Sequence, residues 1–297
     1  MPMTKEEKEQ LLDAIKRTGL KRGANLGEII VPDDYPLYQE KVERETVTID
    51  CPESGVPVTC YIFTAKDKME KCPVHINIHG GGFFLPHFDK DDMYCARVAS
   101  ETHGIVVDID YATTADYAFP VAFQQCYAVA AWTFGQCTAW GADEQRVSIG
   151  GQSAGGTLTA AVCLRAAADD TFPGKLCMQI LNFAGIDMYE TLDSENPRFV
   201  AFAQLYADGD GEVLKNPYAS PIYAPDEMLK NQPYSVIISA GLCPFRDRDE
   251  EYGMRLVAMG NEVTMRRFVN SRHAFTIGLV DEWEESQKFI IRCINER

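Results

Sequence analysis

The chain has 297 residues, of which 46% are hydrophobic and 24% are charged, a composition that excludes collagen-like, coiled-coil and disordered proteins. Its 28 basic and 44 acidic residues give a formal net charge of −16, which repels nucleic acids and anionic lipid surfaces. We therefore expect neither a nucleic-acid partner nor a membrane partner.

Two further features of composition predict a cytoplasmic protein. The ten cysteines form no C-x-x-C pair and lie in apolar stretches, which predicts buried free thiols. Residues 1–17 are charged and amphipathic, with neither the apolar core nor the cleavage site of an export signal. The uncharged stretch between Asp116 and Asp143 is long enough to cross a bilayer, but Pro120, Gly135 and several glutamines interrupt it, so we predict a helix in a protein core instead.

The pattern along the chain predicts an α/β fold. Residues 5–18 predict an amphipathic helix, followed by a segment punctuated by glycine and proline up to Pro36. The alternating runs 42–50 and 57–65 flank a turn signal and predict an antiparallel hairpin. Short apolar runs that alternate with helical segments then predict a mostly parallel sheet covered on both faces; they are 74–78, 105–111, 147–150, 176–183, 235–240 and 262–268.

The long gap between these strands, 187–232, predicts an insertion. It is rich in proline and aromatic residues and is too long for a simple connection. We predict an inserted helical cap segment there and an N-terminal cap segment in residues 1–40. Residues 41–186 and 233–297 then form the core.

A candidate nucleophile follows the predicted strand at 147–150. The sequence Gly151-Gln-Ser-Ala-Gly155 opens a helix there, and G-x-S-x-G on a strand-to-helix turn is a nucleophile elbow, which lifts a serine clear of the sheet in a strained conformation. Glycines at 151 and 155 are needed because the strand and helix backbones come close together. Ser153 is therefore the candidate nucleophile.

A glycine run, His79-Gly-Gly-Gly82, follows the predicted strand at 74–78. Its peptide N–H groups can turn inward because no side chains obstruct them, as an oxyanion hole requires. We expect Gly81, Gly82 and the amide of Ala154 to bind the oxygen of a tetrahedral intermediate. The alternatives are a flexible glycine loop and a phosphate-binding loop, and the glycine patterns of a phosphate-binding loop do not occur here.

His273 is the candidate general base. It alone among the five histidines follows both the serine and the last predicted strand, which gives the order Ser, acid, His of α/β hydrolases. For the other histidines a structural role is favoured, because they lie in a strand, in the glycine run, in a loop and at a helix end; they are His75, His79, His87 and His103.

Residues 72–294 resemble the hormone-sensitive-lipase-like esterases of the α/β-hydrolase superfamily. The resemblance rests on the order and spacing of seven motifs: His79-Gly-Gly-Gly82, Asp110-Tyr111 before Phe119-Pro120, Gly141-Ala-Asp143, Gly151–Gly156, Ser220-Pro-Ile-Tyr223, Gly241–Asp247 and His273-Ala-Phe275. It implies an α/β-hydrolase fold with a cap and a carboxylic ester hydrolase that acts on small hydrophobic esters. We expect neither metal nor organic cofactor, because the sequence has no H-E-x-x-H, no cysteine cluster and no dinucleotide fingerprint.

The chain departs from the family at the acid of the triad. The family pattern D-P-L-R-D-E begins with the aspartate that orients the histidine, whereas this chain reads Cys243-Pro-Phe-Arg-Asp247. Loss of that acid costs roughly 10⁴-fold in rate in a serine protease. A neutral thiol, with a reference pKa of about 8.5, is a weak substitute.

Three interpretations compete. Asp187 or Asp247 could reach His273 instead, or the enzyme could work as a Ser-His dyad with modest turnover. Alternatively the site could have become a ligand-binding pocket, as in the plant gibberellin receptor. A receptor needs neither an elbow serine nor its base, so the residues favour an esterase, with a catalytically weak or inactive ligand-binding protein as the alternative. The natural ester and self-association into a homo-oligomer stay open. Candidates to line the pocket are Phe83, Phe84, Phe199, Phe202 and Tyr206.

Overall fold

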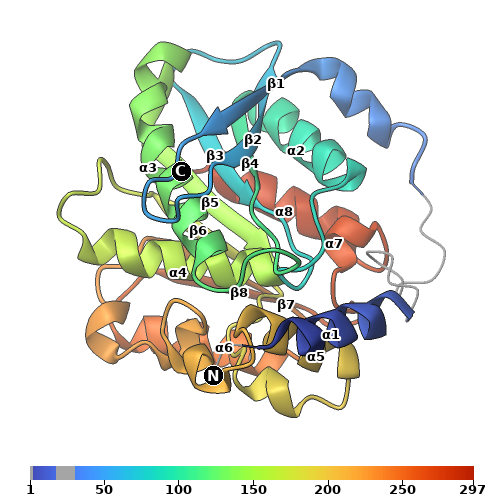
Figure 1. Ribbon diagram of the computed structural model, residues 1–297. Helices are drawn as coiled ribbons and strands as arrows, with labels where there is room; N and C mark the ends of the chain where they lie inside the picture. The colour runs from blue at the N-terminus through green and yellow to red at the C-terminus, as the bar shows by residue number, and fades with distance from the viewer. Residues whose placement is uncertain (1–2, 18–30) are drawn as a thin grey trace.

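The computed structural model describes residues 3–17 and 31–297. In these residues an eight-stranded sheet runs through the middle of the molecule in the order β1-β2-β4-β3-β5-β6-β7-β8 (Figure 1). β2 is antiparallel to both neighbours, and β3 to β8 are parallel. The strands are β1 (Val42–Ile49), β2 (Val58–Ala65), β3 (Cys72–Ile78), β4 (Ile105–Asp110), β5 (Ala142–Gln152), β6 (Met178–Asn182), β7 (Tyr234–Ala240) and β8 (Val263–Phe268).

Helices cover both faces of the sheet (Figure 1). β3 and β6 are buried along their whole length, as strands covered on both faces must be. The fold is therefore the predicted α/β-hydrolase fold with a mostly parallel sheet. On one face lie α3 (Val121–Trp140), α4 (Ala154–Ala168) and α6 (Arg246–Ala258), and on the other lie α2 (Asp89–Thr102), α7 (Phe275–Gly278) and α8 (Trp283–Asn295).

The predicted strands lie within a few residues of the observed ones, with β5 as the exception. The hairpin has the predicted antiparallel pairing, from Val42 with Ala65 to Ile49 with Val58. β5 begins at Ala142 rather than at residue 147, because Ala142 pairs with Cys72. Its first residues are polar and largely exposed, so they lack the apolar signal of a buried strand.

The uncharged stretch contains the whole of α3, whose inner side packs in the main core. Among the described residues, none of the helices has both the length and the hydropathy that a membrane span needs. All ten cysteines are free, as predicted, and all but Cys177 are buried.

The segment 187–232 is mostly built of short helical turns. In it lie η3 (Glu190–Asp193), α5 (Pro197–Tyr206), η4 (Gly211–Lys215), η5 (Pro221–Tyr223) and η6 (Asp226–Leu229), where η denotes a 3₁₀ helix. Asn196 caps α5, since its side chain accepts the amide hydrogen of Arg198, and Pro197 takes the first helical position.

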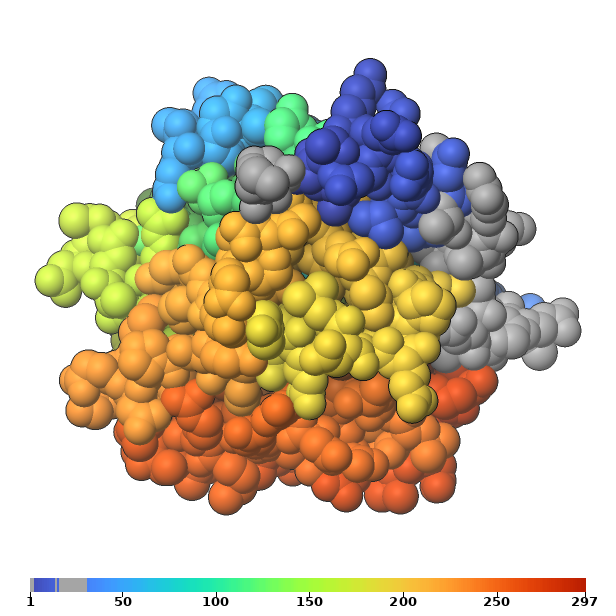
Figure 2. Space-filling view, turned by 60° about the horizontal axis from the view of Figure 1, so that its bottom comes forward, coloured from blue at the N-terminus to red at the C-terminus, as the bar shows by residue number. Residues whose placement is uncertain are grey.

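The N-terminal helix α1 (Lys5–Arg17) packs on α5. Ile15 is buried in a cluster with Phe202 and Leu205 of α5, and Leu11 and Leu12 pack against the same cluster. Figure 2 shows α1 in dark blue beside the yellow and orange residues of 187–232 on this face. The predicted helix 5–18 is thus confirmed to residue 17, and the link that follows lies outside the described residues up to residue 30. It leads into η2 (Tyr35–Lys41). The division of the chain into cap and core stays a prediction.

Candidate active site

Ser153 lies on the sharp turn between β5 and α4. Its backbone angles, φ 54° and ψ −120°, are strained for a residue with a side chain. A Cβ atom on Gly155 would lie 1.9 Å from the carbonyl oxygen of Ile78, and one on Gly151 would lie 2.3 Å from the carbonyl carbon of Gly155. Only glycine therefore fits at 151 and 155, as predicted for an elbow.

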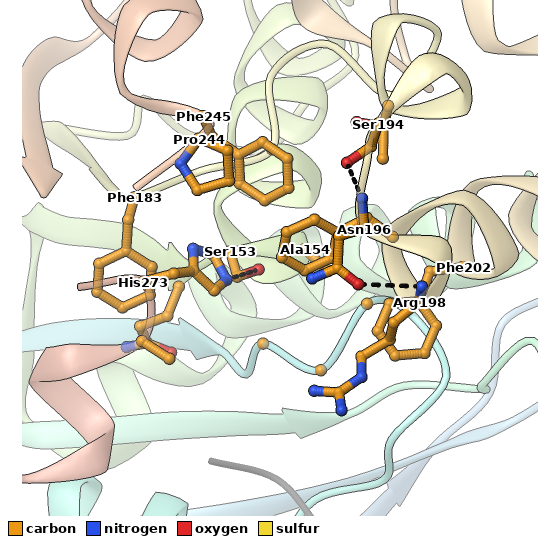
Figure 3. A pocket seen from close by; sticks show the side chains of 18 of the residues that line it. Ser153, Ala154, Phe183, Ser194, Asn196, Arg198, Phe202, Pro244, Phe245 and His273 are labelled. Carbon is orange, nitrogen blue, oxygen red and sulfur yellow. Dashed lines mark hydrogen bonds between the residues drawn. The ribbon is translucent and has the colours of Figure 1, made fainter. Parts of the chain in front are cut away.

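His273 lies between β8 and α7, next to the elbow. Its Nε2 is 2.9 Å from Ser153 Oγ (Figure 3). The imidazole packs edge-on against Phe183 and Phe245, with ring centroids 5.2 Å away in each case. Burial lowers the pKa of His273 to about 4. The ring is therefore neutral at pH 7 and can accept a proton from the serine.

Cys243 faces the other nitrogen of this imidazole. Its Sγ lies 3.1 Å from His273 Nδ1. Burial raises the pKa of the Cys243 thiol well above its ordinary value, so the sulfur is neutral at pH 7. If Nε2 accepts the hydrogen of Ser153, Nδ1 must carry the ring hydrogen and donate it to the sulfur.

The two carboxylates that could replace the missing acid are directed elsewhere. Asp247 is exposed and pairs with Arg246 at 2.7 Å. Asp187 accepts the amide hydrogen of Glu190, the first residue of η3, at 2.8 Å and lies 3.5 Å from Arg248. Within residues 3–17 and 31–297, no hydrogen bond or ion pair joins either carboxylate to His273.

The predicted oxyanion donors lie on the same cavity as Ser153. Gly81 and Gly82 have φ values of 122° and 64°, which favour glycine. A Cβ on Gly82 would lie 2.2 Å from the ring of Phe202, so α5 packs directly on the glycine run. Ala154 begins α4, and the amides of a first helical turn have no acceptor within their helix. The three residues predicted as oxyanion donors thus line the same cavity as the candidate nucleophile, and their role stays a prediction.

His79 braces the glycine run, as predicted. Its Nδ1 lies 2.7 Å from the carbonyl oxygen of Gly80, and its ring stacks on Tyr111 at a centroid distance of 4.2 Å. The Tyr111 hydroxyl donates to the His79 carbonyl at 3.0 Å. These contacts give His79 a structural role.

The cavity around these groups measures about 780 Å³ and has mainly apolar walls near the serine. Phe83, Phe199 and Phe202 line it as predicted, whereas the other two candidates, Phe84 and Tyr206, do not. Tyr206 is instead fully buried and stacks on Phe83, with the ring centroids 3.8 Å apart. Sequence reasoning missed Phe183 and Phe245, because nothing in their local sequence separates them from core residues. Figure 3 shows both beside the imidazole.

Asp249 is a buried carboxyl group that sequence reasoning also missed. It lies in the first turn of α6 and is 2% exposed. Burial raises the pKa of this carboxyl group well above the usual range. The sequence does contain a signal for this burial. Asp249, Tyr252 and Leu256 fall at i, i+3 and i+7, a spacing that places them on one side of α6, and that side is buried.

A cluster of charged residues surrounds His87, which connects the glycine run to α2. His87 Nε2 lies 2.8 Å from Asp108 and 3.2 Å from Asp92, and Arg44 lies 3.2 Å from Asp92. Burial opposes a charge on His87, but the two carboxylates outweigh it and raise the pKa of His87 to about 10.

Among the described residues, His87, Asp92 and Asp108 are the group close enough together to hold a metal ion. With His87 protonated, the imidazolium and Arg44 balance the two carboxylates. We therefore interpret the cluster as an ion-pair network, which satisfies its charges without a metal.

We expect His87→Gln to lower the free energy of unfolding by about 3 kcal/mol at pH 6, because it leaves the buried Asp108 carboxylate without its charged partner. The folded-state pKa of about 10 lies above the unfolded value near 6.5. The stabilisation is therefore full below about pH 6.5 and is lost as the pH rises through about 10.

Urea titrations at pH 6, 8 and 10 measure the difference in the free energy of unfolding between the natural chain and His87→Gln. His103→Asn is the matched control, since His103 pairs with Asp67 at the surface and its loss is expected to change stability little. A deficit that stays constant up to pH 10 would show that the His87 charge does not stabilise the fold.

Comparison with known proteins identifies the family. Residues 75–277 match the family model of the α/β hydrolase fold. Esterase LipI of Mycobacterium tuberculosis is 29% identical over 256 residues, which cover 82% of this chain and 78% of that protein. The arylesterase of Saccharolobus solfataricus is 26% identical over 208 residues, 67% of each chain.

The structure of the hyperthermophilic esterase from the archaeon Pyrobaculum calidifontis superimposes with a TM-score of 0.79 at 23% identity and covers 100% of this chain and 99% of that one. This likeness shows the fold. The family match covers most of the chain and includes the elbow, the glycine run and His273. The chain therefore belongs to the α/β hydrolase fold family, and its predicted resemblance to the hormone-sensitive-lipase-like branch is confirmed.

Proposed function

We propose that the protein is a carboxylic ester hydrolase in which Ser153 attacks the ester carbonyl and His273 takes and returns the proton, while Cys243 stands where the acid would be. Relatives whose names describe them as esterases support the ester hydrolase. One geometric observation carries the assignment of residues: a continuous line from Cys243 Sγ through both nitrogens of His273 to Ser153 Oγ, with distances of 3.1 and 2.9 Å.

The reaction follows from this line. His273 Nε2 takes the hydroxyl hydrogen as Ser153 Oγ bonds to the carbonyl carbon, and the amides of Gly81, Gly82 and Ala154 donate to the oxygen that becomes negative. The imidazolium then gives its proton to the leaving alcohol oxygen, and an acyl-enzyme remains. Water, deprotonated by the same imidazole, releases the acid and restores the serine.

The neutral thiol supports this cycle only in part. As an acceptor for Nδ1–H it keeps the ring in the tautomer that leaves Nε2 free. It carries no charge, so it does not stabilise the imidazolium that forms when the serine loses its proton. Burial, which lowers the pKa of His273 to about 4, adds to the cost of forming this cation. We therefore expect slow turnover and a preference for esters with good leaving groups.

The walls of the cavity favour hydrophobic esters. Phenyl rings of Phe183, Phe199, Phe202 and Phe245 line it near the reacting groups. Apolar surface of this kind binds acyl or alkyl groups by removing them from water. The lining also includes charged side chains of η3 and the residues after it, Asp193 and Glu195 among them.

A fluorophosphonate probe tests the assignment, because it forms a stable bond only with an activated serine. We expect mass spectrometry to find the adduct on the peptide that contains Ser153, and hydrolysis of p-nitrophenyl butyrate to disappear in step with labelling. The second candidate, a ligand-binding protein, is favoured by Cys243 alone. It would be supported if the protein neither reacts with the probe nor hydrolyses p-nitrophenyl acetate or butyrate.

A further inference from the structure

Gln152, the residue before the nucleophile, ends a buried chain of polar side chains. Its Nε2 donates to Asn77 Oδ1 at 3.1 Å, and Asn77 Nδ2 donates to Asp108 Oδ1 at 2.6 Å. The other oxygen of Asp108 lies 2.8 Å from His87 Nε2. Asn77 and Asp108 are 0% exposed and Gln152 is 3% exposed. These buried side chains therefore link the ion-pair network at His87 to the elbow.

The pairing of the strands sets the order of the residues in this row of buried polar side chains. β3 lies between β4 and β5, so Asn77 is in register with Asp108 on one side and Gly150 on the other. An unpaired buried polar group is costly, and both ends of the Asn77 amide are paired here, its oxygen with Gln152 and its nitrogen with Asp108. Asn77 can serve both neighbours in only one orientation, and that orientation fixes the amide of Gln152.

The backbone of Gln152 touches both parts of the catalytic machinery. A Cβ atom on Gly80 would lie 2.7 Å from the carbonyl oxygen of Gln152 and 3.3 Å from Ser153 Cβ. The glycine run therefore packs tightly against the elbow at Gln152. A shift of this residue changes the distance between the Ser153 hydroxyl and the amides of Gly81 and Gly82.

Ser153 needs such support, because strained backbone angles persist only where the surroundings hold them. We propose that Gln152 and Asn77 are positioning residues, which use the buried chain from His87 and Asp108 to hold the elbow at its working distance from the glycine run. This inference rests on the proposed function, since it concerns the same serine.

Gln152→Met tests the proposal, because methionine keeps the length of the side chain and removes its amide. The matched control is Gln179→Met on β6. Gln179 is also 0% exposed and donates one hydrogen bond, to Ser235 Oγ at 2.9 Å, outside the catalytic machinery. Both variants lose one buried hydrogen bond and should lose similar stability. We expect only Gln152→Met to lower kcat, by about 10- to 100-fold with KM little changed, since a misplacement of about 1 Å costs up to 10²-fold.

Rates are normalised to serines titrated with the fluorophosphonate, so loss of folded protein does not count as loss of turnover. If Gln152→Met does not fold, Gln152→Leu, which also removes the amide and adds no charge, is measured in its place. A double-mutant cycle with His87→Gln gives a second readout, and we expect the combined loss in kcat to be smaller than the product of the single losses.

Different results would contradict the proposed function and the positioning role of Gln152. If the natural chain and Ser153→Ala hydrolyse the ester at equal rates, the proposed function fails, and this inference fails with it. If the natural chain shows serine-dependent turnover but the Gln152 variant keeps its kcat, or the cycle is multiplicative, only the positioning role is overturned.

Discussion

Replacing Cys243 with aspartate is expected to raise kcat for p-nitrophenyl butyrate by about 10²- to 10⁴-fold, the upper value being the effect of the triad acid in a serine protease. A carboxylate at this position faces His273 Nδ1, where the sulfur lies at 3.1 Å. The amides of Phe245 and Arg246 at the start of α6 already donate toward the sulfur and would also donate to an anion. The substitution thus supplies the charge that the imidazolium lacks.

The same substitution is expected to move the pH profile. General-base catalysis needs neutral His273, so kcat/KM in the natural chain should rise with pH through about 4 and be level at neutral pH. A carboxylate beside Nδ1 stabilises the imidazolium and raises the pKa of His273. The acid limb of Cys243→Asp should therefore lie at higher pH than that of the natural chain, even as the plateau rises.

Steady-state kinetics from pH 3.5 to 9 measure both effects. Cys243→Asn is the matched control, because it offers an acceptor of similar shape without charge, and we expect it to give neither the gain nor the shift. If Cys243→Asp leaves kcat unchanged and the natural chain already has an acid limb near 6.5, another carboxylate supports His273. Asp187→Asn and Asp247→Asn would then identify it by the loss of kcat.

Replacing Ser153 with alanine is expected to have an effect that depends on residue 243. In subtilisin, loss of the serine costs about 2 × 10⁶-fold in kcat and loss of the aspartate alone costs about 3 × 10⁴-fold, so the serine still contributes roughly 10²-fold when the acid is missing. We therefore expect Ser153→Ala to lower kcat about 10²-fold in the natural chain. In the Cys243→Asp background the loss should reach at least about 10⁴-fold, because serine, imidazole and carboxylate act as a unit.

The natural chain, Ser153→Ala, Cys243→Asp and the double variant are compared at saturating p-nitrophenyl butyrate. The uncatalysed rate is subtracted from each. Equal losses in both backgrounds would mean that residue 243 does not act through the serine. A loss near 10⁶-fold in the natural chain would mean that Cys243 already works as a full member of the triad, in which case the thiol must ionise beside the histidine.

Most of the fold could be predicted from the sequence, because its signals are local. The parallel strands are short apolar runs, and the hairpin is marked by alternation on both sides of a turn signal. The start of β5 could not be predicted, since its first residues are polar and become a strand through pairing with β3. Phe84 and Tyr206 were predicted to line the cavity and do not, because a ring of either kind can turn toward the core or the cavity without a change in local sequence.

The sequence by itself determined that Ser153 lies on an elbow, since Gly151 and Gly155 are the residues that such a close approach of strand and helix permits. It also determined that no carboxylate occupies position 243. Only the tertiary structure decided what faces the imidazole in its place. Asp187 and Asp247 are both near His273 in the predicted topology, but Asp187 binds the Glu190 amide and lies beside Arg248, and Asp247 pairs with Arg246. Which of these contacts form depends on how the folded chain places each carboxylate. The row of buried polar side chains from Gln152 to His87 also depends on the tertiary structure. It joins side chains from several strands, which come into contact only after the sheet has formed.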